Sequence, residues 1–93
     1  MIRNFIHKGL ERYFTKSDRR GIDANHADRI RRLLDRLDTI AKAEDMNMPG
    51  YKFHPLKGDR KGTYAVTVSG NWRITFKFED GDATNVNLED YHG

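Results

Sequence analysis

Three consecutive residues near the end of the chain could exchange protons with a substrate. Asp90, Tyr91 and His92 carry a carboxylate, a phenol and an imidazole, and only Gly93 follows them. Together they offer a hydrogen-bond acceptor, a donor and a base that titrates near neutral pH. This set suits a reaction driven by proton transfer, whereas the structural alternative is a solvated chain end that frays.

The strands that must position this tripeptide are predicted from the alternation of apolar and polar residues. Such alternation runs along 72–78 and again along 85–89, and Asp80-Gly81 between them is a strong hairpin signal. Counting outward from that turn sets Arg73 opposite Leu88, Glu89 or Asp90. The same reasoning about the Gly70 turn sets Thr67 across from Arg73. We therefore expect a basic residue beside the terminal tripeptide.

The earlier part of the chain is predicted to supply the layer that covers the sheet. Apolar residues at helical spacing predict a short helix over 8–15 and a longer one from Asp23 or Asn25 to about Ala43, after a short opening strand over 2–6. A further strand over 51–54 is expected to end at Pro55. The fold class is thus α+β, with two N-terminal helices packed on one face of a mostly antiparallel, strongly twisted sheet of four to five strands.

The two faces of this sheet are expected to differ in chemistry. The face under the helices is predicted to be apolar, with Trp72, Ile74, Phe76, Phe78, Val86 and Leu88. The opposite face is left polar, with Lys52, His54, Thr67, Arg73, Thr75, Lys77, Asn85 and Asn87. Such side chains match phosphates and sugar hydroxyls better than a hydrophobic ligand.

Composition narrows the classes of function. Ninety-three residues predict one domain spanning 1–93, and the absence of Cys excludes disulfides, zinc–thiolate sites and cysteine catalysis. The polar N-terminus has neither a signal peptide nor a membrane-spanning stretch, so we expect a cytoplasmic protein. His and carboxylate residues lack zinc-ligand spacing, so no metal and no cofactor are expected. A net charge of +3 favours a polyanionic partner, nucleic acid first.

A basic loop is predicted between two of the strands. It runs over 54–62, where Gly58 and Gly62 permit tight turns and Lys57, Arg60 and Lys61 supply positive charge. Lys57 and Arg60 are therefore candidate phosphate ligands, although an ordinary solvated loop has the same composition.

Three segments, in this order and spacing, resemble a known family. His54-Pro55-Leu56-Lys57-Gly58-Asp59-Arg60, Asn71-Trp72-Arg73-Ile74-Thr75-Phe76 and Glu89-Asp90-Tyr91-His92 are similar to the corresponding segments of the HigB toxins of the RelE superfamily. The resemblance covers essentially the whole chain and is most specific over 51–92. Gly93 extends past the usual final His, which is a small departure from the family pattern.

The resemblance implies an activity and its partners. HigB toxins are ribosome-dependent mRNA endonucleases of toxin-antitoxin pairs, which cut the codon in the decoding (A) site of the translating 70S ribosome. The expected partners are therefore the ribosome with its small-subunit rRNA, the mRNA, and a helix-turn-helix antitoxin. The antitoxin would neutralise the toxin and repress their shared operon, so operator DNA would be contacted only through it.

The resemblance also implies site residues. In this chain His54, Asp90, Tyr91 and His92 match residues tied to activity, and Lys57 and Arg73 match basic positions. We assign His92 as general base and His54 as general acid in metal-independent attack by the RNA 2′-hydroxyl, although the reverse assignment fits the sequence equally well. His7 and His26 do not belong to a group of candidate site residues and are interpreted as surface residues.

Alternatives remain for the residues and for the function. His54 could be a strand-end residue satisfied by the backbone, Arg73 a cross-strand partner of Glu89, and Tyr91 a core aromatic. The competing functions are a gyrase-inhibiting toxin of the same fold and a non-catalytic RNA-binding module.

Overall fold

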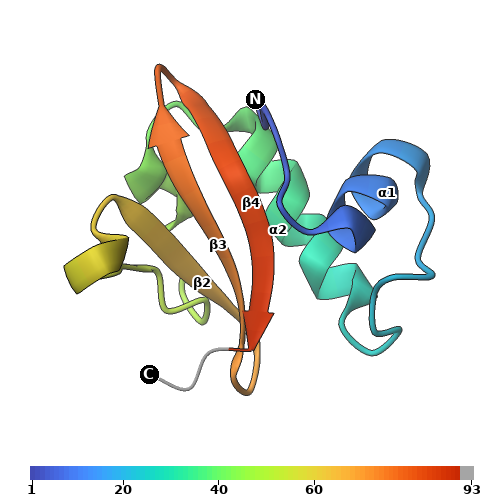
Figure 1. Cartoon of the computed structure of the whole chain (residues 1–93). Coiled ribbons are helices and arrows are strands. Elements are labelled where there is room, and N and C mark those ends of the chain that lie inside the picture. Colours follow the sequence, from blue (N-terminus) through green and yellow to red (C-terminus); the bar gives the residue numbers. More distant parts are fainter. Residues whose placement is uncertain (91–93) are drawn as a thin grey trace.

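The computed structural model describes residues 1–90, which form two α-helices and a four-stranded antiparallel sheet (Figure 1). The helices are α1 (Lys8–Lys16) and α2 (Ala27–Thr39), and the strands are β1 (His54–Pro55), β2 (Thr63–Ser69), β3 (Trp72–Glu79) and β4 (Asp82–Asp90), in the spatial order β1-β2-β3-β4. Two short 3₁₀ helices, η1 (Ala43–Met46) and η2 (Gly58–Arg60), lie in the connections. The predicted α+β class is confirmed.

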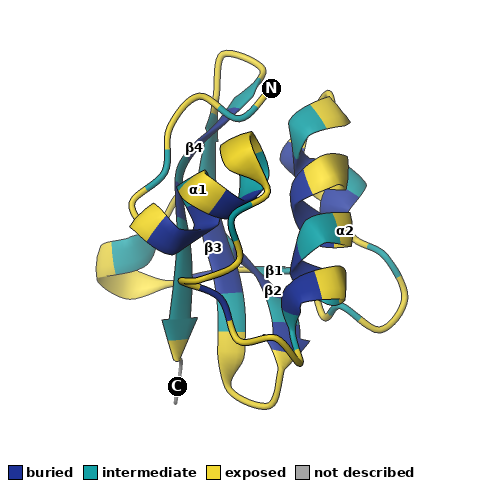
Figure 2. Cartoon of the chain, turned by 90° about the vertical axis from the view of Figure 1, so that its right-hand side faces the viewer, coloured by how far each residue is buried: buried dark blue, intermediate teal, exposed yellow. Residues whose placement is uncertain are grey.

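The core lies between the helices and one face of the sheet. The apolar residues of α2 are buried, and so are most inward-facing residues of the strands, whereas Phe78 and Leu88 are only partly buried. In Figure 2 the buried sides of the helices face inward. The largest of these side chains are Leu10, Ile30, Leu33, Leu34, Leu37, Val66, Ile74, Phe76 and Val86. Burying each large apolar side chain contributes about 1.5–3 kcal/mol, so this layer dominates the stability of the fold.

The long helix is shorter at both ends than the sequence predicts. Asp23 accepts a hydrogen bond from the Asn25 amide at 2.8 Å and so forms a turn before the helix, which begins at Ala27. At the other end the helix stops at Thr39, because Ile40 takes up an extended backbone with ψ of 153°. The carboxylate of Asp45 then accepts amide protons of the next segment, so the chain up to Ala43 is not part of α2.

The N-terminal segment lies along the outer edge of β4. Ile2 and Phe5 form isolated parallel bridges with Ala83 and Val86, instead of the continuous opening strand that was predicted. The Asn4 side-chain amide donates to Asn85 Oδ1 at 2.9 Å, which fastens the segment to the point where Asn85 has a positive φ of 53°. This contact covers the edge of β4 that would otherwise be open to pairing.

The predicted register of the last hairpin is confirmed. Arg73 pairs with Glu89 across β3 and β4, and with Thr67 across β2 and β3. The ladder shifts by one residue between Thr75 and Lys77, which accommodates the bulge at Asn85.

Two expectations about the sheet are wrong. Trp72 is 39% exposed rather than buried under the helices, because it begins β3 at the tip of the β2–β3 hairpin, beside a register irregularity. The strand expected over 51–54 is reduced to His54 and Pro55, since Lys52 has a positive φ of 51° that interrupts the extended backbone. Pro55 belongs to the strand, which is tolerated because β1 is an edge strand.

Candidate functional site

The sheet face away from the helices carries most of the polar candidates. Residues directly across a ladder share a face, so His54 shares a row with Ala65, Thr75 and Asn87. The neighbouring row holds Thr67, Arg73 and Glu89. The centre of this face is polar but buried: Thr63 and Thr75 lie beneath side chains that reach across from η2.

His54 is held in a defined orientation at the sheet edge. Its Nδ1 lies 2.8 Å from the carbonyl oxygen of Lys52. A carbonyl oxygen only accepts, so this hydrogen bond places a proton on Nδ1 and leaves Nε2 as the nitrogen that can exchange a proton with a ligand. The half-buried ring is thus both satisfied by the backbone and available for acid–base chemistry.

Within residues 1–90 the strand order keeps His54 and Asp90 apart. β2 and β3 lie between the strands that carry them, which corresponds to roughly 14 Å at the usual strand spacing. Asp90 pairs with Trp72, so by alternation it belongs to the opposite face from Arg73 and Glu89. Tyr91 and His92, the other two predicted catalytic residues, lie outside the described residues.

Arg73 is directed to the hairpin turn rather than to Glu89. Its Nη1 donates to the carbonyl oxygens of Gly70 at 2.6 Å and Trp72 at 3.2 Å. Its buried Nε finds no hydrogen-bond acceptor within residues 1–90. Nη1 therefore holds the guanidinium at the hairpin turn, at the end of β3 that pairs with the last residues of β4.

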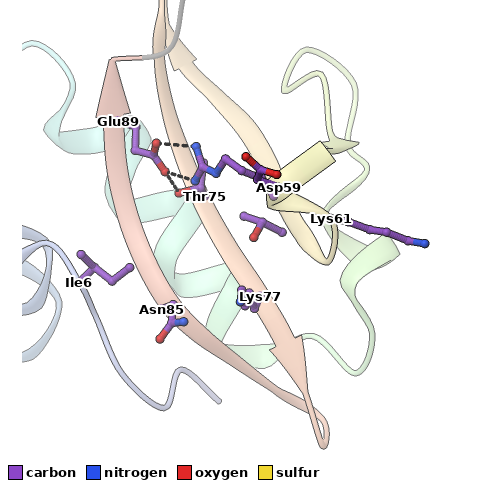
Figure 3. Close-up of a pocket in the computed structure, with 9 residues that line it drawn as sticks. Ile6, Asp59, Lys61, Thr75, Lys77, Asn85 and Glu89 are labelled. Atoms are coloured by element: carbon purple, nitrogen blue, oxygen red, sulfur yellow. Dashed lines mark hydrogen bonds and ion pairs between the residues drawn. The ribbon is translucent and has the colours of Figure 1, made fainter. Parts of the chain in front are cut away.

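Arg60, a predicted phosphate ligand, contacts the Glu89 carboxylate. Arg60 Nη1 and Nη2 donate to Glu89 Oε1 and Oε2 at 2.8 and 2.6 Å, and the Thr75 hydroxyl also donates to Oε2 (Figure 3). These hydrogen bonds, Arg60 first, lower the pKa of the Glu89 carboxyl. Asp59, Lys61 and other residues around this pair line a cavity of about 220 Å³ on the polar face.

Lys57 lies on the exposed part of the basic loop. It lines a second cavity, of about 490 Å³, together with Pro55, Leu56, Gly58, Lys61, Gly62 and Tyr64. Pro55 and Tyr64, which line this cavity, pair with each other in the row next to that of His54, so by alternation they belong to the opposite face of the sheet from the imidazole. The described residues contain no group of three or more His, Asp or Glu side chains arranged to hold a metal ion.

Comparisons with known proteins identify the family. The family model described as "RelE-like toxin of type II toxin-antitoxin system HigB" matches residues 3–92. The chain is 49% identical over 92 residues to "Endoribonuclease HigB" of Proteus vulgaris, covering 99% of this chain and 100% of that protein. The chain belongs to the HigB-like toxin family. This toxin is also 31% identical over 91 residues to "Toxin HigB-1" of Vibrio cholerae serotype O1, covering 96% of each chain.

Membership in the family implies a partner for this HigB-like toxin and agrees with its fold. A toxin of a type II system is paired with an antitoxin, so a protein partner is part of its biology. The α+β architecture is consistent with the RelE-like toxins to which the family description assigns the chain. Among the described residues no helix is long and apolar enough to cross a membrane.

Sequence reasoning missed the structural role of Glu89. It weighed Glu89 only as a cross-strand partner of Arg73, and the Cα pairing of these two residues agrees with that. The actual partner, Arg60, lies on a loop whose path depends on tertiary packing. One signal for this contact was present in the sequence. Glu89 is an acidic residue on the same predicted sheet face as Thr75, and the basic loop supplies a cation that could neutralise it.

Proposed function

We propose that this HigB-like toxin is an endoribonuclease that cuts mRNA in the A site of the translating ribosome and so inhibits translation. The observation that carries the proposal is the 49% identity, over 92 residues, to a protein named for endoribonuclease activity. The backbone-held His54, the turn-anchored Arg73 and the exposed Lys57 support it, because each supplies a group that such chemistry needs.

The proposed chemistry needs no metal, because RNA carries its own nucleophile. A base removes the proton of the 2′-hydroxyl, and the oxygen forms a bond to the adjacent phosphorus. The bond from phosphorus to the 5′ oxygen then breaks, and an acid protonates that oxygen. The products are a 2′,3′-cyclic phosphate and a 5′-hydroxyl.

The candidate residues divide between proton transfer and charge stabilisation. His92 is assigned as the base, with Asp90 orienting it or sharing its work, and His54 as the acid, acting through Nε2. Exchange of the two histidine roles fits the same observations. Tyr91 would stack on a base or donate a hydrogen bond to the phosphate.

Positive charge near the phosphate would stabilise the transition state. Arg73 and Lys57 are assigned this role, because the phosphorane-like transition state carries more negative charge on its oxygens than the ground state. Arg73 suits it in particular, since its contacts with Gly70 and Trp72 hold the guanidinium before any RNA binds.

The partners follow from the proposed target. A net charge of +3 favours approach to ribosomal RNA, and a helix-turn-helix antitoxin would block the toxin and link it to operator DNA. Since translating ribosomes are the target, the toxin would act in the cytoplasm.

A reconstituted cleavage assay tests the proposal. The purified toxin is incubated with one mRNA, alone or in a translating ribosome complex, and the new ends are analysed chemically. We expect cutting only in the ribosome complex, with 2′,3′-cyclic phosphate ends. Fragments that end in a 3′-hydroxyl would contradict the mechanism, and equal cutting of free mRNA would contradict the ribosome dependence.

A further inference from the structure

The ion pair between Arg60 and Glu89 joins two parts of the candidate site that are distant in sequence. Arg60 ends η2, on the loop that follows His54 and contains Lys57. Glu89 immediately precedes Asp90 at the end of β4. The pair therefore connects the segment that carries one candidate histidine to the strand that leads into the terminal tripeptide.

The geometry of the pair is that of a fixed contact. Each terminal nitrogen of the guanidinium donates to a different carboxylate oxygen, an arrangement that defines orientation as well as distance. The Thr75 hydroxyl holds the same carboxylate from β3, as Figure 3 shows. The carboxylate side chain is only 22% exposed, so water competes weakly for it.

The loop needs such a contact, because its backbone is anchored at few points. Leu56 donates its amide to the Thr63 carbonyl at 2.8 Å, which closes the base of the loop. Gly58 and Gly62 both have positive φ, so the loop turns at residues with wide conformational freedom. Without a side-chain anchor on η2, the positions of Lys57 and of η2 relative to β4 would be weakly defined.

We propose that Arg60 and Glu89 are positioning residues, whose ion pair sets the spacing between the loop beyond His54 and the end of β4. The proposal rests on the proposed endoribonuclease function, since it is this site that the pair would arrange. The proposal gives Arg60 a positioning role, whereas the sequence analysis made it a candidate phosphate ligand. RNA would have to displace a two-point carboxylate contact before a phosphate could take that place.

Single substitutions separate positioning from phosphate binding. Glu89→Gln and Arg60→Ala are compared with the unmodified toxin on ribosome-bound mRNA, and kcat and KM are measured at several salt concentrations. We expect each variant to lower kcat by about tenfold or more and to change KM less than about twofold, because small displacements of reacting groups cost rate more than binding. The salt dependence of KM should stay unchanged.

A charge exchange provides the rescue. The double variant Arg60→Glu with Glu89→Arg keeps an ion pair across the same gap, and we expect it to recover most of the lost kcat. The matched control is Asp82→Asn, which removes a carboxylate paired with Arg3 at 3.0 Å from the opposite end of β4 and should leave kcat unchanged.

Other results would overturn the proposal. If Glu89→Gln cuts at the normal rate while Arg60→Ala raises KM and weakens its salt dependence, Arg60 is a phosphate ligand and no positioning residue. A charge exchange that cuts no faster than the single variants would also overturn the positioning role of the pair.

A structural readout distinguishes failure of this inference from failure of the proposed function. Amide hydrogen exchange over 57–62 is measured in the full-length toxin, and we expect faster exchange in Glu89→Gln than in Asp82→Asn. If the unmodified toxin cuts no mRNA, the proposed function fails while this measurement still tests the anchor. Unchanged exchange in Glu89→Gln would overturn the anchor itself.

Discussion

At the residue scale, His7 has a structural role that its sequence context does not reveal. It was interpreted as a surface residue, but it is the N-cap of α1, and its Nδ1 accepts a hydrogen bond from the Leu10 amide at 3.1 Å. Burial first, and then the nearby positive charge of Arg12, lower the pKa of the His7 imidazole below 6.5. Folding therefore favours the neutral ring.

This capping role predicts a pH dependence of stability. The unfolded chain takes up the His7 proton near pH 6.5 and the folded chain only at lower pH, so the stabilisation is complete above pH 6.5 and is lost as pH falls through the folded pKa. Urea unfolding measured between about pH 5 and 7 should show this loss. His7→Asn keeps a capping acceptor that does not titrate, so it should flatten the slope. An equal slope in both proteins would remove His7 as its cause.

His54 and His26 form a matched pair for testing the chemistry. His26 occupies the N-cap position of α2 without a side-chain capping hydrogen bond, whereas His54 is oriented by the Lys52 carbonyl. His54→Ala should lower the cleavage rate by about 10²- to 10⁴-fold, the usual contribution of general acid–base catalysis, and His26→Ala should leave it unchanged. Comparable rates for the two variants in single-turnover assays would exclude His54 as a catalytic residue.

At the scale of elements, the start of α1 depends on two glycines in close contact. A Cβ on Gly9 would lie 2.7 Å from the carbonyl oxygen of Gly21 and 2.8 Å from the His7 ring. Gly9→Ala should therefore lower the free energy of unfolding by about 1–3 kcal/mol, although alanine favours helices, because backbone atoms must move apart. Lys8→Ala, at an exposed position of the same turn, is the control and should change it by less than about 0.5 kcal/mol.

The elements also mark how far sequence patterns predict this structure. Local signals determined the Asp80-Gly81 hairpin, so the pairing of Arg73 with Glu89 followed from counting. Alternation failed for Trp72, because a period of two does not say where a strand leaves the cover of a helix. The Arg60 contact with Glu89 could not be predicted, since it depends on how a glycine-containing loop folds back over the sheet.

At the scale of the whole molecule, residues 1–90 hold the helices, the strands and the core that the structure describes. The buried core residues of this part lie between Leu10 and Val86. Deleting residues 91–93 should therefore leave thermal unfolding close to that of the full chain while abolishing cleavage. Loss of folded protein on this deletion would mean that the tail is structural rather than catalytic.

The measurement that tests the central claim most directly is a map of mRNA 5′ ends after brief induction of the toxin in cells. It is repeated with an inhibitor that clears ribosomes from the message, and with the His54→Ala variant as control. We predict new 5′ ends that follow the reading frame, disappear when ribosomes are cleared, and are absent in the variant. Intact mRNA during growth arrest, or cuts that ignore the frame and persist without ribosomes, would contradict a ribosome-dependent endoribonuclease.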